Sequence, residues 1–151
     1  MEERFNEFTL KILMLNRYVG AIKNIEMDEF NLKGIHASIL NNLYFNEEIT
    51  AATLTKNILE DKAAVSRALK ELYDKKLIDY CGKKYNAKII LTNFGREIAL
   101  NVIEKIDKAV AAGGATLTDE KRIIFYEALE IICKNLGAYY RSLEENDESI
   151  L

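Results

Sequence analysis

The chain has 151 residues, about the size of one ordinary domain, and 49% of them are hydrophobic, which is enough to build a core. It contains no proline, and this favours uninterrupted helices. No segment approaches the roughly 20 apolar residues that span a bilayer, and the charged N-terminus lacks the apolar stretch of a signal peptide. We therefore expect a cytoplasmic protein that has no membrane partner.

The charges are unevenly distributed along the chain. The net charge of −3 is unfavourable for binding to DNA. However, residues 50–95 hold nine lysines and arginines against five aspartates and glutamates, a net charge of +4, so the rest of the chain carries −7. A basic middle between two acidic ends predicts a central nucleic-acid-binding face flanked by regions with another role.

The N-terminal segment has the apolar pattern of a helix that packs against another helix. Apolar residues recur there at alternating spacings of three and four. They are Phe5, Phe8, Ile12, Leu15, Val19 and Ile22. A helix cannot bury this seam alone, so we expect a partner helix from this chain or from a second copy. The pattern ends in a predicted break at residues 25–30, and a second helix is expected to start near Asn31, which caps helices well.

The middle of the chain predicts two short helices followed by a hairpin. A turn at residues 45–49 precedes a helix at 50–59. The next helix runs from about 62 to 75, and Asp61 is its expected N-cap. Two runs rich in β-branched and aromatic residues then flank a turn that contains glycine and asparagine. This arrangement is typical of a β-hairpin, with strands around residues 77–80 and 88–91.

Two long helices are expected in the C-terminal part. Thr92 is the predicted cap of the first, which ends at Gly113 and Gly114, and Thr118 opens the second. The second helix carries a long apolar stripe that includes Phe125, Leu129, Ile132 and Leu136. The whole order predicts a mostly α-helical chain with a small β-hairpin wing, which is the winged helix-turn-helix.

The helix at 62–75 has the features of a DNA-recognition helix. Small residues on its outer side allow close approach to the major groove, and polar residues there can bond to base edges and phosphates. On an isolated helix, Arg67 and Lys70 would suit an ordinary solvated face, but the basic hairpin that follows favours DNA binding. The predicted DNA-binding residues are Lys62, Ala63, Ala64, Ser66, Arg67, Lys70, Lys83, Lys84 and Lys88.

Residues 31–100 resemble the multiple-antibiotic-resistance regulator (MarR) family of bacterial transcription factors. The resemblance lies in Leu54, in DKAAVSRALKELYDKKLI (Asp61–Ile78) and in IILTNFGREI (Ile89–Ile98). It implies an obligate homodimer whose first and last helices interlock and whose two recognition helices contact a pseudo-palindrome. It also implies regulation by a small ligand, aromatic or amphipathic, between the DNA-binding and dimerisation regions.

The expected organisation has three parts. Residues 1–30 form an N-terminal dimerisation helix, residues 31–95 the winged helix-turn-helix, and residues 96–151 the C-terminal dimerisation helices. The apolar seam and stripe independently require a helical partner. The predicted dimer-interface residues are Phe5, Phe8, Ile12, Leu15, Phe125, Leu129, Ile132 and Leu136.

The sequence departs from the family pattern at three places. The family wing usually carries Asp-x-Arg near its tip, whereas Lys83 and Lys84 stand here, so we expect weaker minor-groove recognition. Lys76 stands where the family often has glycine, and a positive φ there would cost about 1 kcal/mol. Lys33 replaces the family's capping threonine, which moves the expected cap to Asn31.

Other residues carry weaker signals. The single histidine, His36, could contact a ligand or sense pH, but one histidine is no metal site, and a structural or surface role is favoured. Cys81 could be a redox switch, but inert thiols are expected at both cysteines, with Cys133 in the core. An aromatic ligand pocket or packing at a dimer interface could explain Tyr18, Tyr44, Tyr139 and Tyr140.

No catalytic pattern is found in the sequence. It contains no glycine-rich phosphate loop, no serine elbow and no second histidine, so we expect no enzyme, no cofactor and no metal site. The sequence favours a transcriptional regulator, most simply a repressor. An alternative of another class is a winged-helix dimer that binds proteins, as an adaptor or antirepressor, and has little affinity for DNA.

Overall fold

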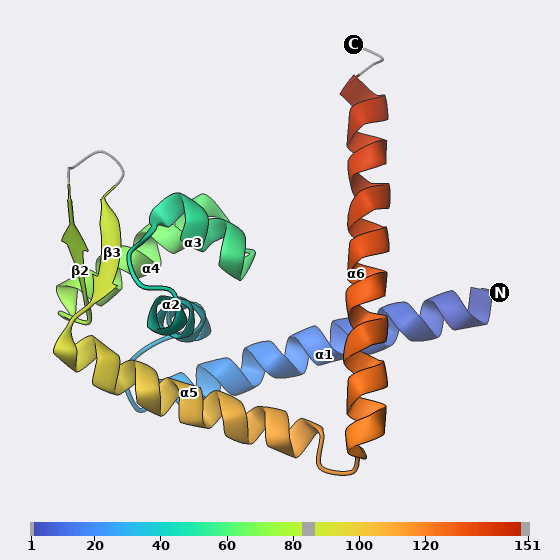
Figure 1. Ribbon diagram of the computed structural model, residues 1–151, viewed down its shortest axis with the longest axis horizontal. Coiled ribbons are helices and arrows are strands. Elements are labelled where there is room, and N and C mark those ends of the chain that lie inside the picture. Colours follow the sequence, from blue (N-terminus) through green and yellow to red (C-terminus); the bar gives the residue numbers. More distant parts are fainter. Residues whose placement is uncertain (1, 83–86, 149–151) are drawn as a thin grey trace. The chain divides into compact units, whose positions relative to one another are not determined.

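The computed structural model describes the backbone of residues 2–82 and 87–148, and the side chains of residues 6–82 and 87–144. The chain forms two compact units, residues 1–109 and 110–151, which divide within α5. The described residues confirm the predicted fold class, a winged helix-turn-helix with long flanking helices (Figure 1). The elements are α1 (Glu2–Asp28), α2 (Gly34–Phe45), β1 (Ile49–Thr50), α3 (Ala51–Ile58), α4 (Lys62–Asp74), β2 (Ile78–Cys81), β3 (Lys88–Leu91), α5 (Asn93–Gly113) and α6 (Asp119–Glu148).

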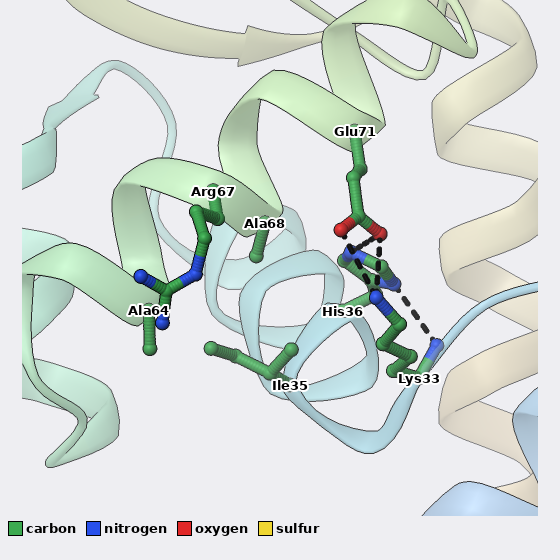
Figure 2. Close-up of a pocket in the computed structure, with 7 residues that line it drawn as sticks. All are labelled: Lys33, Ile35, His36, Ala64, Arg67, Ala68 and Glu71. Carbon is green, nitrogen blue, oxygen red and sulfur yellow. Dashed lines mark hydrogen bonds and ion pairs between the residues drawn. The ribbon is translucent and has the colours of Figure 1, made fainter.

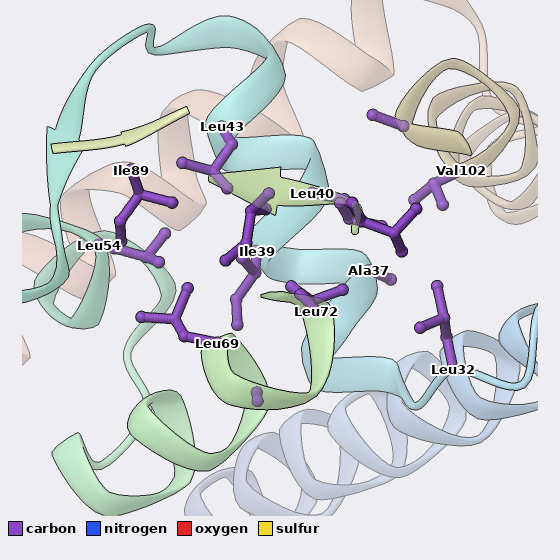
Figure 3. Close-up of a cluster of buried hydrophobic side chains, with 14 of the residues drawn as sticks. Leu32, Ala37, Ile39, Leu40, Leu43, Leu54, Leu69, Leu72, Ile89 and Val102 are labelled. Carbon is purple, nitrogen blue, oxygen red and sulfur yellow. The ribbon is translucent and has the colours of Figure 1, made fainter. Parts of the chain in front are cut away.

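Helix α2 is the centre of the first unit. It packs against α1, α3, α4 and β3. Its residues Ile39 and Leu40 are completely buried. Side chains from the surrounding elements close the same cluster, among them Leu54, Leu69, Leu72, Ile89 and Val102 (Figure 3). Because burying one such side chain contributes about 1.5–3 kcal/mol, this shared core fixes α3 and α4 relative to α2.

The junction between α1 and α2 differs from the prediction. Helix α1 continues through the expected break to Asp28, because Met27 is buried in the core. Asn31 does not cap α2. It adopts a left-handed φ of 52° and ends α1, where its N–H donates to the carbonyl of Asp28 at 2.9 Å. The N–H of Leu32 donates to the carbonyl of Met27 at 3.0 Å, which completes a Schellman motif. Helix α2 therefore starts later than predicted, at Gly34.

A third strand widens the predicted hairpin into an antiparallel sheet. Strands β2 and β3 lie where the sequence predicts them, and the sheet order is β1-β3-β2. Residues 45–49 were predicted as a turn, but Ile49 pairs with Ile89 and Thr50 with Lys88. A two-residue strand is too short to show a period-2 pattern, so the sequence gives no signal for β1.

The end of α4 confirms the unusual position of Lys76. Its φ is 60°, a conformation that costs a lysine about 1 kcal/mol. The N–H of Leu77 donates to the carbonyl of Leu72 at 3.0 Å and closes the helix. The hydroxyl of Thr92 donates to the carbonyl of Lys76 at 2.7 Å and accepts from the N–H of Gly95 at 2.9 Å. Thr92 thus caps α5, as predicted, and joins α5 to the end of α4.

The second unit contains the end of α5 and α6. Helix α5 ends at Gly113, as predicted, and Thr118 accepts from the N–H of Lys121 at 3.3 Å at the start of α6. Cys133 is exposed, so its expected place in a core is wrong. The reason is that no described side chain of α6 is buried, since only the last turn of α5 shares its unit and this is too short to cover the apolar stripe. In the described part of the chain, no helix is long and apolar enough to cross a membrane.

Gly95 is the glycine at which an added methyl group should disturb the fold most. A Cβ built there would lie 1.8 Å from the carbonyl oxygen of Leu77. We expect Gly95→Ala to lower the free energy of unfolding by about 3 kcal/mol, because backbone of α5 and of the α4–β2 connection must separate. Thermal unfolding followed by circular dichroism measures this loss. Gly113→Ala is the matched control, since its Cβ would meet nothing within 4 Å. Equal melting temperatures for the two variants would contradict the close approach.

Candidate nucleic-acid interface

Helix α4 is held in place at its start and along its inner face. The side chain of Asp61 accepts from the N–H of Ala64 at 2.8 Å, which confirms the predicted N-cap. Leu59, with a left-handed φ of 56°, makes the turn between α3 and α4. The inner face is buried in the core through Val65, Ala68, Leu69 and Leu72. The opposite face of the helix is therefore presented to solvent in a fixed orientation.

The predicted DNA-binding residues of α4 gather on this outer face. Ala64 is half-buried and the others are exposed, namely Lys62, Ala63, Ser66, Arg67 and Lys70. Lys88 is exposed at the start of β3, while Lys83 and Lys84 lie outside the described residues. The two small alanines leave room for a groove to approach, and the longer polar side chains stand beside them.

Two of these cations carry carboxylate partners. Lys70 donates to Asp74 at 2.7 Å, and Lys88 donates to Glu48 at 2.7 Å. These hydrogen bonds raise the pKa of both lysines, and the bond from Lys88 lowers the pKa of Glu48. Exposed ion pairs are worth only about 0–1 kcal/mol, so a phosphate could displace either carboxylate at little cost. Within the described residues, Lys62 and Arg67 form no ion pair.

A polar cluster that the sequence did not reveal connects the start of α2 with α4. His36 is only 1% exposed, and its Nδ1 accepts from the backbone N–H of Lys33 at 2.9 Å. Its Nε2 lies 3.3 Å from Oε2 of Glu71, a contact without good hydrogen-bond geometry. The Nζ of Lys33 donates to both oxygens of Glu71, at 3.0 and 3.2 Å (Figure 2).

This cluster shows that Lys33 is the N-cap of α2, although its side chain cannot accept a bond from the helix. His36 fulfils part of the capping role, because its ring accepts the backbone N–H of Lys33. Burial is the main cause that lowers the pKa of His36, and Glu71 partly opposes it. The hydrogen bond from Lys33 lowers the pKa of Glu71. Of the structural or surface role predicted for His36, burial of the ring supports the structural one.

The predicted dimer-interface residues are mostly exposed. On α1 these are Phe8, Ile12 and Leu15, while the side chain of Phe5 lies outside the described residues. On α6, Leu129 is half-buried, and Phe125, Ile132 and Leu136 are exposed. Each unit by itself therefore leaves an apolar helix face uncovered. Within the described residues, no group of three or more acidic, histidine or cysteine residues could hold a metal ion, and both cysteines are free.

The capping role of Asp61 gives a direct test of how α4 is held. We expect Asp61→Ala to lower the free energy of unfolding by about 1 kcal/mol, because the N–H of Ala64 loses its acceptor. Asp61→Asn should retain most of the stability, since its side-chain oxygen can accept the same bond. Chemical denaturation of both variants makes the comparison. A loss of the same size in Asp61→Asn would show that the negative charge, and not the cap, is what matters.

Comparisons with known proteins extend these observations. No family model and no curated protein matches the sequence. Among solved structures, a MarR-family transcriptional regulator from Listeria monocytogenes, complexed with 26mer DNA, is 22% identical over 91% of this chain and 93% of its own, with a TM-score of 0.81. A MarR protein from Peptoclostridium difficile is 21% identical over 90% and 91% of the two chains, with a TM-score of 0.80. A MarR transcriptional regulator from Methanosarcina mazei is 19% identical over 85% and 88%, with a TM-score of 0.77. The chain therefore has the fold of the MarR-family transcriptional regulators.

Proposed function

We propose that this chain is a sequence-specific DNA-binding transcriptional regulator and not an enzyme. The proposal rests on the way in which α4 is held. The inner face of α4 is buried in the core, while four residues of its outer face are exposed, namely Ala63, Ser66, Arg67 and Lys70. The structural neighbour from Listeria monocytogenes supports the proposal, because a protein of the same fold is described in complex with 26mer DNA.

Each type of side chain on this face suits a different part of the duplex. An arginine can form bidentate hydrogen bonds with guanine, so we assign base recognition to Arg67. Ala63 and Ala64 can contact thymine methyl groups, and Ser66 can bond to a base or a phosphate. The remaining cations are assigned to phosphates, which fix the position of the protein without specifying sequence. They are Lys62 and Lys70 of α4, with Lys83, Lys84 and Lys88 of the wing.

We further propose that the regulator is a homodimer on a pseudo-palindromic operator. The exposed apolar faces of α1 and α6 support a second copy as the partner, since an apolar face of this length is unfavourable in water. A two-fold dimer would place two copies of α4 against two half-sites of one DNA face. A repressor follows most simply from this arrangement, because a dimer seated on an operator excludes other proteins from it.

A small ligand could regulate such a dimer. An open cleft of about 280 Å³, with a mostly apolar lining, lies between the ends of α1 and α4 and the start of α5. Its lining residues are Phe30, Leu32, Lys75, Leu77, Phe94 and Ile98. A ligand there would contact the connections that follow α1 and α4, together with the first turns of α5. We therefore assign this cleft to an aromatic or amphipathic effector.

A protein-interaction module is the second candidate function. It is favoured by the carboxylates that already form ion pairs with Lys70 and Lys88, and by the net charge of −3. The two functions differ in how binding responds to salt. Binding to duplex DNA weakens steeply as salt rises because phosphate contacts release counterions.

Removal of the Arg67 side chain tests the assigned recognition face. We expect Arg67→Ala to weaken binding to the operator duplex by about 1–3 kcal/mol, because a contact with a base edge is lost. Fluorescence anisotropy measures the affinity, and thermal unfolding should be unchanged because Arg67 is exposed. Lys108→Ala is the control, since it removes one exposed positive charge from α5. If Arg67→Ala binds as tightly as the control, α4 does not recognise DNA through this face.

A further inference from the structure

We propose that His36 positions the recognition helix α4 while its ring is neutral, and that uptake of a second proton by the ring loosens α4 and weakens DNA binding. The inference rests on the proposed function, because α4 is the helix assigned to DNA. The contacts involved connect α2 with α4 within one chain, so this link does not depend on a partner. His36, Lys33 and Glu71 form this link (Figure 2).

The surroundings of His36 determine which ring nitrogen carries the proton. The backbone N–H of Lys33 points at Nδ1 from 2.9 Å. An N–H can donate only to a ring nitrogen that has no hydrogen, so Nδ1 is unprotonated in this arrangement. The proton of the neutral ring therefore lies on Nε2, which faces the carboxylate of Glu71 at 3.3 Å. The ring is 1% exposed, and among the described residues Nε2 has no hydrogen-bond partner of good geometry.

The ring of His36 extends from the first turn of α2 towards Glu71 in the last turn of α4. Glu71 belongs to α4 and stands four residues after Arg67, so the two residues occupy neighbouring turns on one side of the helix. Both line a cleft of about 230 Å³ together with Lys33 and His36 (Figure 2). A displacement of the turn that carries Glu71 would therefore move Arg67 as well.

A second proton on the ring is incompatible with this geometry. It would have to bind Nδ1, where it would face the N–H of Lys33, and two donors would then oppose each other across 2.9 Å. The N–H of Lys33, the N-cap residue of α2, would lose its acceptor, and the ring or Lys33 would have to move. Since Lys33 also holds the carboxylate of Glu71 at 3.0 Å, this movement reaches α4.

The charged groups around His36 decide when the proton binds. Burial lowers the pKa of His36 below its ordinary value of 6.5, Glu71 opposes this effect, and Lys33 and Lys75 add to it. Arg67 lines the same cleft, and on the α1 side Lys23 donates to Ser38 at 2.9 Å. His36 binds its second proton less tightly in the folded state than in an unfolded one. Its contribution to the free energy of unfolding is therefore fully present above about pH 6.5 and is lost as the pH falls below that value.

The first experiment observes the ring without any mutation. His36 is the only histidine, so nitrogen-15 NMR of the full chain reports on it without ambiguity. We expect a protonated Nε2 and an unprotonated Nδ1 at neutral pH, and a titration below pH 6.5 that shifts the amide signal of Lys33. The opposite tautomer, or a titration that leaves the amide of Lys33 unchanged, would overturn the proposal. This result does not depend on DNA.

The second experiment compares DNA binding by the wild type and His36→Gln at constant salt. A glutamine can accept from Lys33 through its oxygen and donate towards Glu71 through its nitrogen, but it does not titrate. Between about pH 7.5 and about pH 5.5 we expect the wild type to lose affinity for duplex DNA relative to the variant. The loss is at most about tenfold for each pH unit below the pKa of His36. Parallel pH profiles would contradict the link between the ring and α4.

A third variant covers the possibility that His36→Gln does not fold. Glu71→Gln removes the charge that favours the protonated ring, so its pH transition should move to lower pH than in the wild type. An unchanged transition would contradict the proposal. If the wild type binds no duplex at neutral pH, the proposed function fails, while the NMR titration still decides whether His36 forms the link.

Discussion

The shared core around α2 is the interaction on which the rest of the structure depends. Because α2 packs against α1, α3, α4 and β3 at once, α4 has little freedom to move alone. The DNA recognition proposed for its outer face requires this rigidity, since contacts with base edges need side chains placed within a fraction of an ångström. Under the proposed function, the buried leucines of α4 matter for recognition even though none of them would contact DNA.

Specific ends of helices set the geometry that this core then holds. Asn31 and Lys76 both adopt a left-handed conformation, and each turns the chain sharply after a helix. At the second of these turns, Thr92 and Gly95 bring α5 directly against the end of α4. The start of α5 and the end of α4 are therefore mechanically connected, and the proposed ligand cleft lies beside that connection.

Periodicity in the sequence predicted most of the fold, and local capping signals predicted the starts of α4, α5 and α6. Asp61, Thr92 and Thr118 cap helices as expected because their side chains act within three residues. Asn31 was misassigned, since asparagine suits both the start and the end of a helix. The exposed face of α4 followed from its pattern, but its distant partners did not. Glu48 lies 40 residues from Lys88, and Glu71 lies 38 residues from Lys33, so only tertiary packing brings them together.

Selection of bound duplexes from a random DNA pool, followed by a salt series on the enriched sequence, shows directly whether the protein recognises a DNA sequence. We expect an inverted repeat with half-sites about 10 bp apart, and binding that weakens steeply as salt rises. Recovery of no common sequence by a folded protein would contradict a DNA-binding role for α4. The acidic partners of Lys70 and Lys88 would then indicate a surface that meets another protein.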